Sequence, residues 1–327
     1  MSNLDRRPTA RELGGLEGTS AGPALDLLPG KEVLLGESTR VRRLLPTLGR
    51  RLVGAWAFVD HYGPDDIAAG PGMQVPPHPH TGLQTVSWLL DGEVHHRDSL
   101  GSDVTFRPGE LALMTAGHGI AHSEQSPVGH PRYLHGAQLW VVLPDGARDT
   151  APAFEHHPTL PGFSSDGMTA TVLVGELGGA ASPGTTHSPL VGVDLALDAG
   201  SDVELPLDPD FEHGVLAASG AASVEGAPLD RGAMLYLGTG RRTVRVRTGD
   251  GADGGPTRLL LLGGAPFEER IVMWWNFVGR SGEEIADYAE QWNAEGERFG
   301  AVVGYEGDRL AAPPLPPVPL KARGRER

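Results

Sequence analysis

Short apolar stretches separated by glycine and proline run through most of this sequence. With 47 glycines and 28 prolines among 327 residues, long helices find few uninterrupted positions, because proline removes a backbone donor and glycine weakens a helix interior. Brief runs of alternating apolar residues that end at turn residues are typical of strands. The pattern therefore predicts an all-β fold.

The strand pattern occurs twice along the chain, and 327 residues suffice for two domains with separate cores. Residues 220–232 repeat the succession of short strands and turns seen in the first half. Residues 151–188 show this strand pattern less clearly and should contain the connection between the two domains. We predict an internal duplication, with one domain at residues 28–150 and a second at 165–265. The ends, 1–27 and 316–327, are expected to be extended or disordered.

The dipeptide Asp91-Gly92 lies between two expected strands. Glycine tolerates the positive φ that a tight type I′ turn requires, so we expect a two-residue hairpin here. His95 and His96 follow on the second strand of that hairpin. Because neighbouring side chains alternate faces, only one of them can point into a barrel, and we expect both to be structural or exposed.

One helix is predicted near the end of the chain. Ser281-Gly282-Glu283-Glu284 has the form of a capping box, in which a serine side chain accepts from the backbone three residues later. Helical spacing then brings four apolar residues onto one face, namely Ile285, Tyr288, Ala289 and Trp292. Gly296 is the expected stop. The proline-rich stretch 313–319 should be extended.

Two short motifs each place two metal-ligating side chains at a spacing of i and i+2: His78-Pro79-His80 and His122-Ser123-Glu124. In an extended chain such residues point to the same face, so the two motifs could supply three imidazoles and one carboxylate to one site. Because the chain has no cysteine, any metal must bind nitrogen and oxygen. These ligand types suit Fe(II), Mn(II), Ni(II), Cu(II) or Zn(II).

Residues 76–127, which include both motifs and Thr115-Ala116-Gly117-His118-Gly119-Ile120, closely resemble the pirin family. A weaker resemblance extends from about residue 28 to 313 and includes residues 138–144 and 273–281. The resemblance implies two cupin barrels face to face, with the chain after about residue 266 returning to the first barrel. It also implies one divalent metal ion, most often iron, held by four ligands: His78, His80, His122 and Glu124.

The resemblance suggests further residues near this site. His118 lies in a glycine-flanked loop and is assigned to the substrate pocket, with simple solvent exposure as the alternative. Gln84 occupies a position where many pirins carry glutamate, and we place it at the pocket mouth. We expect His61, His130 and His135 to lie in loops or at the surface. The second copy offers only His187 and His213 and is expected to bind no metal.

Some pirins show quercetin 2,3-dioxygenase activity, so the resemblance implies a flavonol-like aromatic substrate and O2 as partners. Glu124 would then be a metal ligand that also accepts the substrate proton. A second hypothesis is non-enzymatic: a change of iron oxidation state tunes binding to a partner protein. A third is a metal-dependent enzyme acting on another enolisable or phenolic substrate.

Charge and hydropathy exclude other classes. A net charge of −15 repels the phosphate backbone, and the basic residues form no long block, so we expect no direct binding to nucleic acid. The N-terminus lacks an apolar signal core, and the sequence contains no apolar run of membrane-spanning length. We expect a soluble cytoplasmic protein without a membrane anchor, whose final residues 321–327 form a solvated tail.

Overall fold

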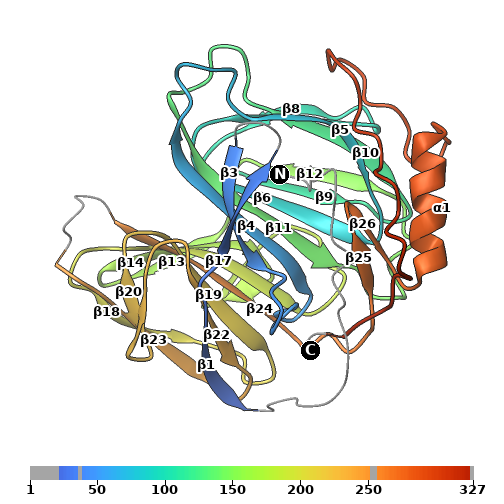
Figure 1. The fold of residues 1–327 in the computed structure, drawn as a ribbon. Coiled ribbons are helices and arrows are strands. Elements are labelled where there is room, and N and C mark those ends of the chain that lie inside the picture. The colour runs from blue at the N-terminus through green and yellow to red at the C-terminus, as the bar shows by residue number, and fades with distance from the viewer. Residues whose placement is uncertain (1–21, 36–38, 251–255, 325–327) are drawn as a thin grey trace.

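The computed structural model describes residues 22–35, 39–250 and 256–324 and consists of two β-sheet units with one helix (Figure 1). The first unit, blue to green in Figure 1, lies above the second, which is mostly yellow and orange. The predicted all-β fold with two barrels and a C-terminal helix is confirmed. Within the described residues, no helix is long and apolar enough to cross a membrane.

The first unit contains a seven-stranded and a four-stranded sheet, both antiparallel. In spatial order, the larger sheet consists of β12 (Ala153–His157), β9 (Leu111–Thr115), β6 (Leu83–Asp91), β11 (Tyr133–Val142), β4 (Trp56–Asp66), β3 (Thr39–Leu45) and β2 (Lys31–Leu35). The smaller consists of β5 (Gln74–His80), β10 (Ile120–Gln125), β7 (Val94–Asp98) and β8 (Asp103–Phe106).

The second unit repeats this plan. Its larger sheet consists of β1 (Pro23–Leu28), β22 (Met234–Gly238), β19 (Glu212–Ser219), β24 (Thr257–Gly264), β17 (Leu190–Leu197), β14 (Met168–Val174) and β13 (Gly162–Ser165). Its smaller sheet consists of β18 (Asp202–Pro206), β23 (Thr243–Thr248), β20 (Ala222–Val224) and β21 (Ala227–Leu229). A short pair, β15 (Glu176–Leu177) and β16 (Ala180–Ala181), lies between β14 and β17 in sequence.

Three strands lie wholly or mostly outside the domain ranges that the sequence suggests, and one of them, β13, begins the second unit at Gly162. Strand β1 precedes the first unit in sequence but pairs with β22 of the second, and Figure 1 shows it among the yellow strands. Strand β12 extends the sheet of the first unit to His157. The connection between the two units is therefore shorter than the loose sequence at 151–188 indicates.

The two seven-stranded sheets contact each other through buried aromatic residues. The indole nitrogen of Trp56 donates to the carbonyl oxygens of Val191 (3.3 Å) and Gly263 (3.1 Å). Trp88 donates to the Asp194 carboxylate across 3.0 Å. The largest buried apolar cluster contains residues of both sheets, so the two units share a core and should unfold together.

The predicted hairpin at Asp91-Gly92 is wrong. Strand β6 pairs with β9 and β11 in the larger sheet, whereas β7 pairs with β8 and β10 in the smaller one. Gly92 adopts the expected positive φ of 92°, but the turn carries the chain around a corner between two sheets. This corner places the β7 histidines in the same sheet as β5 and β10.

After β24 the chain returns to the first unit. The hairpin of β25 (Val272–Trp274) and β26 (Phe277–Gly279) is joined to Thr81 by a bridge at Phe277. Helix α1 (Gly282–Asn293) follows, and its N-cap Ser281 accepts from the Glu284 amide at 3.2 Å, as predicted. The four predicted apolar residues of α1 are all buried, in a cluster that also contains Ala121 of β10. The helix ends three residues before the expected stop at Gly296.

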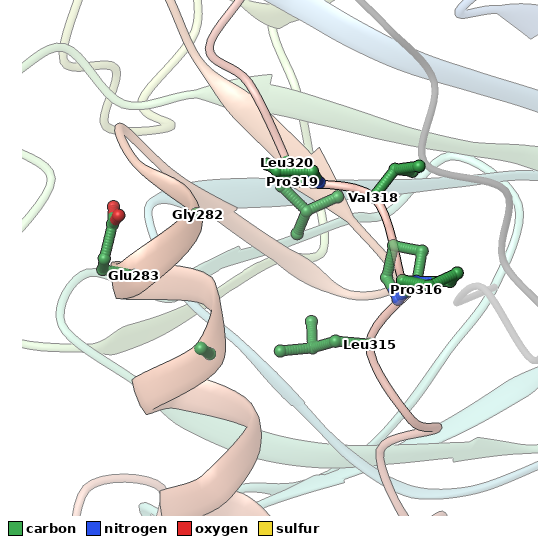
Figure 2. Close-up of a pocket in the computed structure, with 9 residues that line it drawn as sticks. Gly282, Glu283, Leu315, Pro316, Val318, Pro319 and Leu320 are labelled. Carbon is green, nitrogen blue, oxygen red and sulfur yellow. The ribbon is translucent and has the colours of Figure 1, made fainter.

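The segment after residue 312 forms no helix among its described residues, and part of it is anchored to the fold. Residues 315–320 lie beside the first turn of α1 and, with Gly282, Glu283 and Ala286, line a pocket of about 340 Å³ (Figure 2). Further on, Arg323 and Ile271 exchange two backbone hydrogen bonds of 2.9 Å each. The expectation of a solvated tail from residue 321 is therefore wrong for its described part; residues 325–327 lie outside it.

Candidate metal centre

Three neighbouring strands of the four-stranded sheet, β5, β10 and β7, bring polar residues together on one face. His122 of β10 lies opposite His78 on one side and Asp98 on the other, and Glu124 lies opposite His96. This face points toward the larger sheet, because Ser87 of β6 contacts Glu124. The opposite face of β10 carries Ala121, which packs against the returning C-terminal segment. The centre therefore lies inside the first barrel.

The imidazoles of His78, His80 and His122 converge through their Nε2 atoms. The Nε2 atom of His80 lies 3.2 Å from that of His78 and 3.1 Å from that of His122. The Nδ1 atoms of His78 and His80 face carbonyl oxygens, those of Pro76 (2.8 Å) and Asn276 (2.9 Å). A carbonyl only accepts, so these contacts assign the proton to Nδ1 and leave the Nε2 lone pairs facing one another.

Burial keeps these rings neutral. All three are fully buried. Burial lowers the pKa of His80 to about 3, and burial together with the neighbouring His80 ring holds the pKa of His78 well below its usual range. The pKa of His122 is lowered in the same way, by burial and then by the other rings. A neutral imidazole has the lone pair that metal binding requires.

The donor set fits a metal ion. The Nε2 atoms of neighbouring rings lie 3.1–3.2 Å apart, close enough to bind one ion together. With metal–nitrogen bonds of about 2.0–2.1 Å, two imidazole nitrogens at right angles about the ion would be about 3.0 Å apart. Three neutral imidazoles with a nearby carboxylate suit the divalent transition metals, and the ligand types alone do not select one of them.

Glu124 lies beside this centre and completes a second group. Potential ligand atoms of His78, His80 and His122 lie within 4.8 Å of one another, and so do those of His96, His122 and Glu124. His122 is common to both groups. The Glu124 carboxylate lies 3.2 Å from the Ser87 hydroxyl, which is also 2.8 Å from the side-chain oxygen of Gln138. The role of Glu124 as a fourth ligand remains a prediction.

His96 is a site residue whose proximity to His122 the sequence analysis did not predict. It is buried, and its Nδ1 atom lies 3.4 Å from that of His122. Its neighbour His95 points to the other face of β7 and pairs with Asp103. A signal was available, because His96-Arg97-Asp98 is a third motif with the i, i+2 spacing of the other two. The expected hairpin at residue 91 obscured it by placing β7 beside β6.

Gln84 points away from the centre. It is separated from Ser87 by three positions on a regular stretch of β6, so the two side chains occupy opposite faces. Its amide donates to the Thr115 hydroxyl and to the Thr185 carbonyl, each at 2.9 Å, and thereby ties β6 to the segment that connects the two units. The predicted role at the mouth of a substrate pocket gains no support from these contacts.

His118 lies in the turn between β9 and β10, and its side chain is exposed. Its Nδ1 atom is 3.1 Å from the Thr150 carbonyl oxygen, and its own carbonyl accepts from Arg298 at 2.9 Å. The solvent-exposed alternative matches this position, whereas the pocket role stays a prediction.

The expected surface location is wrong for two other histidines. His61 on β4 and His135 on β11 are buried, with their Nε2 atoms 3.0 Å apart. The error arose because their strands are covered by the second unit, which the local sequence does not reveal. His130 lies after a turn at the surface, as expected.

Two barrel units that share one core, with a buried histidine cluster in the first, define a two-domain cupin with a candidate metal centre. The comparisons with known sequences agree. Residues 38–141 match the family model Pirin, and residues 192–300 match the Pirin C-terminal cupin domain. The chain belongs to the pirin family.

Two curated relatives illustrate the range of the family. The chain is 48% identical, over 86% of its length and 88% of the relative's, to a Pseudomonas aeruginosa protein named "Putative quercetin 2,3-dioxygenase". It is 32% identical to human Pirin over 68% of its own length and 77% of the human chain. The chain thus resembles both a protein named as an enzyme and one named only as a pirin.

Solved structures show the same architecture. A crystal structure of quercetin 2,3-dioxygenase from Acinetobacter baumannii aligns with a TM-score of 0.86 and 43% identity, covering 91% of this chain and 98% of that one. A bacterial pirin from Escherichia coli in complex with nickel(II) aligns with a TM-score of 0.57 at 18% identity, covering 75% of this chain and all of that one. The second likeness supports the fold alone.

Proposed function

We propose that this protein is a metal-dependent dioxygenase that opens the flavonol ring of quercetin-like substrates with O2, with Fe(II) as its metal. The observation that carries the proposal is the convergence of three buried imidazoles in the first barrel, with Nε2 of His80 3.2 Å from that of His78 and 3.1 Å from that of His122. The similarity to proteins named as quercetin 2,3-dioxygenases supplies the substrate class.

His78, His80 and His122 would hold the ion, and Glu124 would be the fourth ligand. When bound, the metal would supply the Lewis acidity that binds an enolate oxygen and the redox chemistry that O2 requires. Three neutral imidazoles bring no charge, so one carboxylate leaves a net positive charge at a divalent centre. That charge favours an anionic, deprotonated flavonol over its neutral form.

Glu124 would also accept the proton of the flavonol hydroxyl. The carboxylate is buried, and its contact with Ser87 fixes the position of one oxygen. A positioned carboxylate that receives a proton in the transition state contributes about 10²–10⁴ in rate. Near the imidazoles, the Trp140 ring lies edge-on to His80 at 5.2 Å and stacks on Phe58 at 4.2 Å, so this side of the centre is aromatic and buried.

The test is oxygen uptake by protein loaded anaerobically with Fe(II), on addition of quercetin, with carbon monoxide measured as the co-product. Wild-type protein should consume O2 and release carbon monoxide in equal amounts, and His122→Ala should do neither. His95→Ala is the matched control, because His95 occupies the other face of the same small sheet.

Two other outcomes would redirect the assignment. Turnover of another phenolic or enolisable compound, without turnover of quercetin, would assign a different substrate to the same centre. Oxygen uptake with none of these compounds, by protein shown to contain one Fe(II) per chain, would contradict the enzymatic proposal. The alternative would then be a pirin whose iron oxidation state regulates binding to a partner protein.

A further inference from the structure

The three converging imidazoles differ in what determines the proton on Nδ1. For His78 and His80 the neighbour of Nδ1 is a backbone carbonyl, which only accepts, so the tautomer is set by the main chain. For His122 the neighbour is the Nδ1 atom of His96, at 3.4 Å. An imidazole nitrogen accepts in one tautomer and donates in the other, so His96 decides the tautomer of His122.

Asp98 in turn decides the tautomer of His96. One carboxylate oxygen of Asp98 accepts from the backbone amides of Leu100 (2.9 Å) and Ser102 (3.0 Å). The other lies 3.2 Å from Nε2 of His96. A carboxylate that accepts from two amides has no proton to give, so Nε2 of His96 carries the proton in this contact. The Nδ1 atom of His96 is then an acceptor.

The consequence reaches the metal-binding nitrogen. If Nδ1 of His96 accepts, Nδ1 of His122 carries the proton, and Nε2 of His122 presents a lone pair beside His80. The opposite tautomer of His96 would put a proton on Nε2 of His122, where a metal ligand needs a lone pair. Asp98 therefore determines which nitrogen of His96 is protonated, and His96 in turn determines which nitrogen of His122 is protonated.

The middle member of this chain is held rigidly. The His96 ring stacks on Phe154 of β12 with ring centroids 4.1 Å apart and planes 6° from parallel. His96 and Asp98 are both buried. Each is also held by the register of β7 with β10, in which His96 lies opposite Glu124 and Asp98 opposite His122. Rotation of either side chain would break packing inside the barrel.

We propose that Asp98 and His96 form a positioning relay that sets the tautomer of His122 and thereby the affinity of the centre for its metal. The inference rests on the proposed metal centre but not on the identity of the substrate. Partners that orient metal-ligating histidines typically change metal affinity by 10- to 100-fold when they are removed. In this protein the orienting carboxylate acts through a second histidine.

Asp98→Asn is the sharpest test, because it keeps size and shape. The backbone amides of Leu100 and Ser102 would retain the amide oxygen, which turns the NH2 group toward His96. His96 would then accept at Nε2 and donate at Nδ1, and His122 would be protonated at Nε2. We expect Ni(II) and Fe(II) to bind 10- to 100-fold more weakly in chelator competition without any substrate.

A direct readout is the tautomer itself. In metal-free wild-type protein, nitrogen NMR of labelled histidine should show His122 protonated at Nδ1, and in metal-free Asp98→Asn it should show protonation at Nε2. Asp103→Asn is the matched control, since Asp103 pairs with His95 on the other face of β7. It should retain wild-type affinity and the wild-type His122 tautomer.

Two substitutions of His96 keep the proposal testable if Asp98→Asn does not fold. A glutamine can accept from His122 and donate to Asp98, so the metal affinity of His96→Gln should stay within about threefold of the wild-type value. A leucine can do neither, so His96→Leu should bind the metal 10- to 100-fold more weakly. Equal weakening in both variants would indicate a packing role and overturn the relay. Unchanged affinity in Asp98→Asn, with Nδ1 of His122 still protonated, would also overturn it. Neither result depends on dioxygenase activity.

Discussion

The ring of His80 donates a hydrogen bond of 2.9 Å to the backbone carbonyl of Asn276, 196 positions later in the chain. Asn276 lies at the tip of the two-residue turn between β25 and β26, beside Trp275, which has a positive φ of 53°. The returning C-terminal segment thus takes part in the candidate metal centre. This relationship connects the packing of that segment with the orientation of a ring in the candidate metal centre.

Phe277→Ala should therefore affect both stability and metal binding. Phe277 is fully buried, with its ring 5.8 Å from those of Tyr288 and Phe299. Its truncation should lower the free energy of unfolding by about 3–5 kcal/mol, because the cavity refills only in part. It should also weaken Ni(II) binding by loosening the turn at Asn276. Urea unfolding and chelator competition measure the two effects, and exposed Val303→Ala serves as the control. Reduced stability with unchanged Ni(II) affinity would show that the turn does not orient His80.

His78→Ala should remove most of the stabilisation that metal confers. A metal that binds only the folded protein stabilises it by about 2.7 kcal/mol at 100 times its dissociation constant. At one fixed Ni(II) concentration we expect a clear rise in melting temperature for wild-type protein and for His95→Ala, and little or none for His78→Ala. An equal rise in all three proteins would place the tightest Ni(II) site elsewhere.

Glu124→Gln should reduce quercetin turnover about 100-fold or more, because an amide cannot accept the substrate proton. The change preserves the volume of a buried side chain and its contact with Ser87. Oxygen uptake should be compared at equal Fe(II) content, so that any loss of metal is separated from loss of the base. Glu204→Gln, at an exposed position in the second unit, is the control. Full activity in Glu124→Gln would eliminate this residue as the proton acceptor.

Gln84→Ala distinguishes a structural role from a pocket role. The variant loses hydrogen bonds to Thr115 and Thr185 and leaves the buried Thr115 hydroxyl without its Gln84 partner, which should cost about 1–3 kcal/mol of unfolding free energy. Ni(II) affinity and the KM for quercetin should stay at wild-type values. A raised KM with unchanged stability would instead support the location at the pocket mouth that the sequence suggested.

The metal-free protein should lose stability in acid, in part through His61. Burial, followed by the nearby His135, lowers the pKa of His61 to about 3 in the folded protein, whereas an unfolded histidine takes up its proton near pH 6.5. Below pH 6.5 the unfolded chain gains a proton that the buried His61 does not. The free energy of unfolding is therefore highest above pH 6.5 and declines as the pH falls toward 3, by about 3 kcal/mol at pH 4. Urea unfolding at pH 7 and 4.5 should show a shallower decline for His61→Gln, which does not titrate, than for His130→Gln. Equal declines would mean that His61 takes up its proton without unfolding.

The sequence by itself determined the features that depend on neighbouring residues. Glycine and proline punctuation predicted the β fold, because backbone conformation is chosen locally. The cap at Ser281 and the apolar face from Ile285 to Trp292 follow from helical periodicity alone. The histidines of the two i, i+2 motifs were found for the same reason, since side chains two positions apart share a face in any strand.

Only the tertiary structure decided which strands lie side by side. Asp91-Gly92 could close a hairpin or turn a corner between sheets, and the difference depends on partners of β7 that lie more than twenty residues away. That pairing brings His96 and Asp98 to His122. Likewise, the burial of His61 and His135 depends on the second unit, and the acceptor of His80 on a segment near the end of the chain. A periodic pattern predicts which face of a strand a side chain occupies, but long-range strand pairing determines which residues that face contacts.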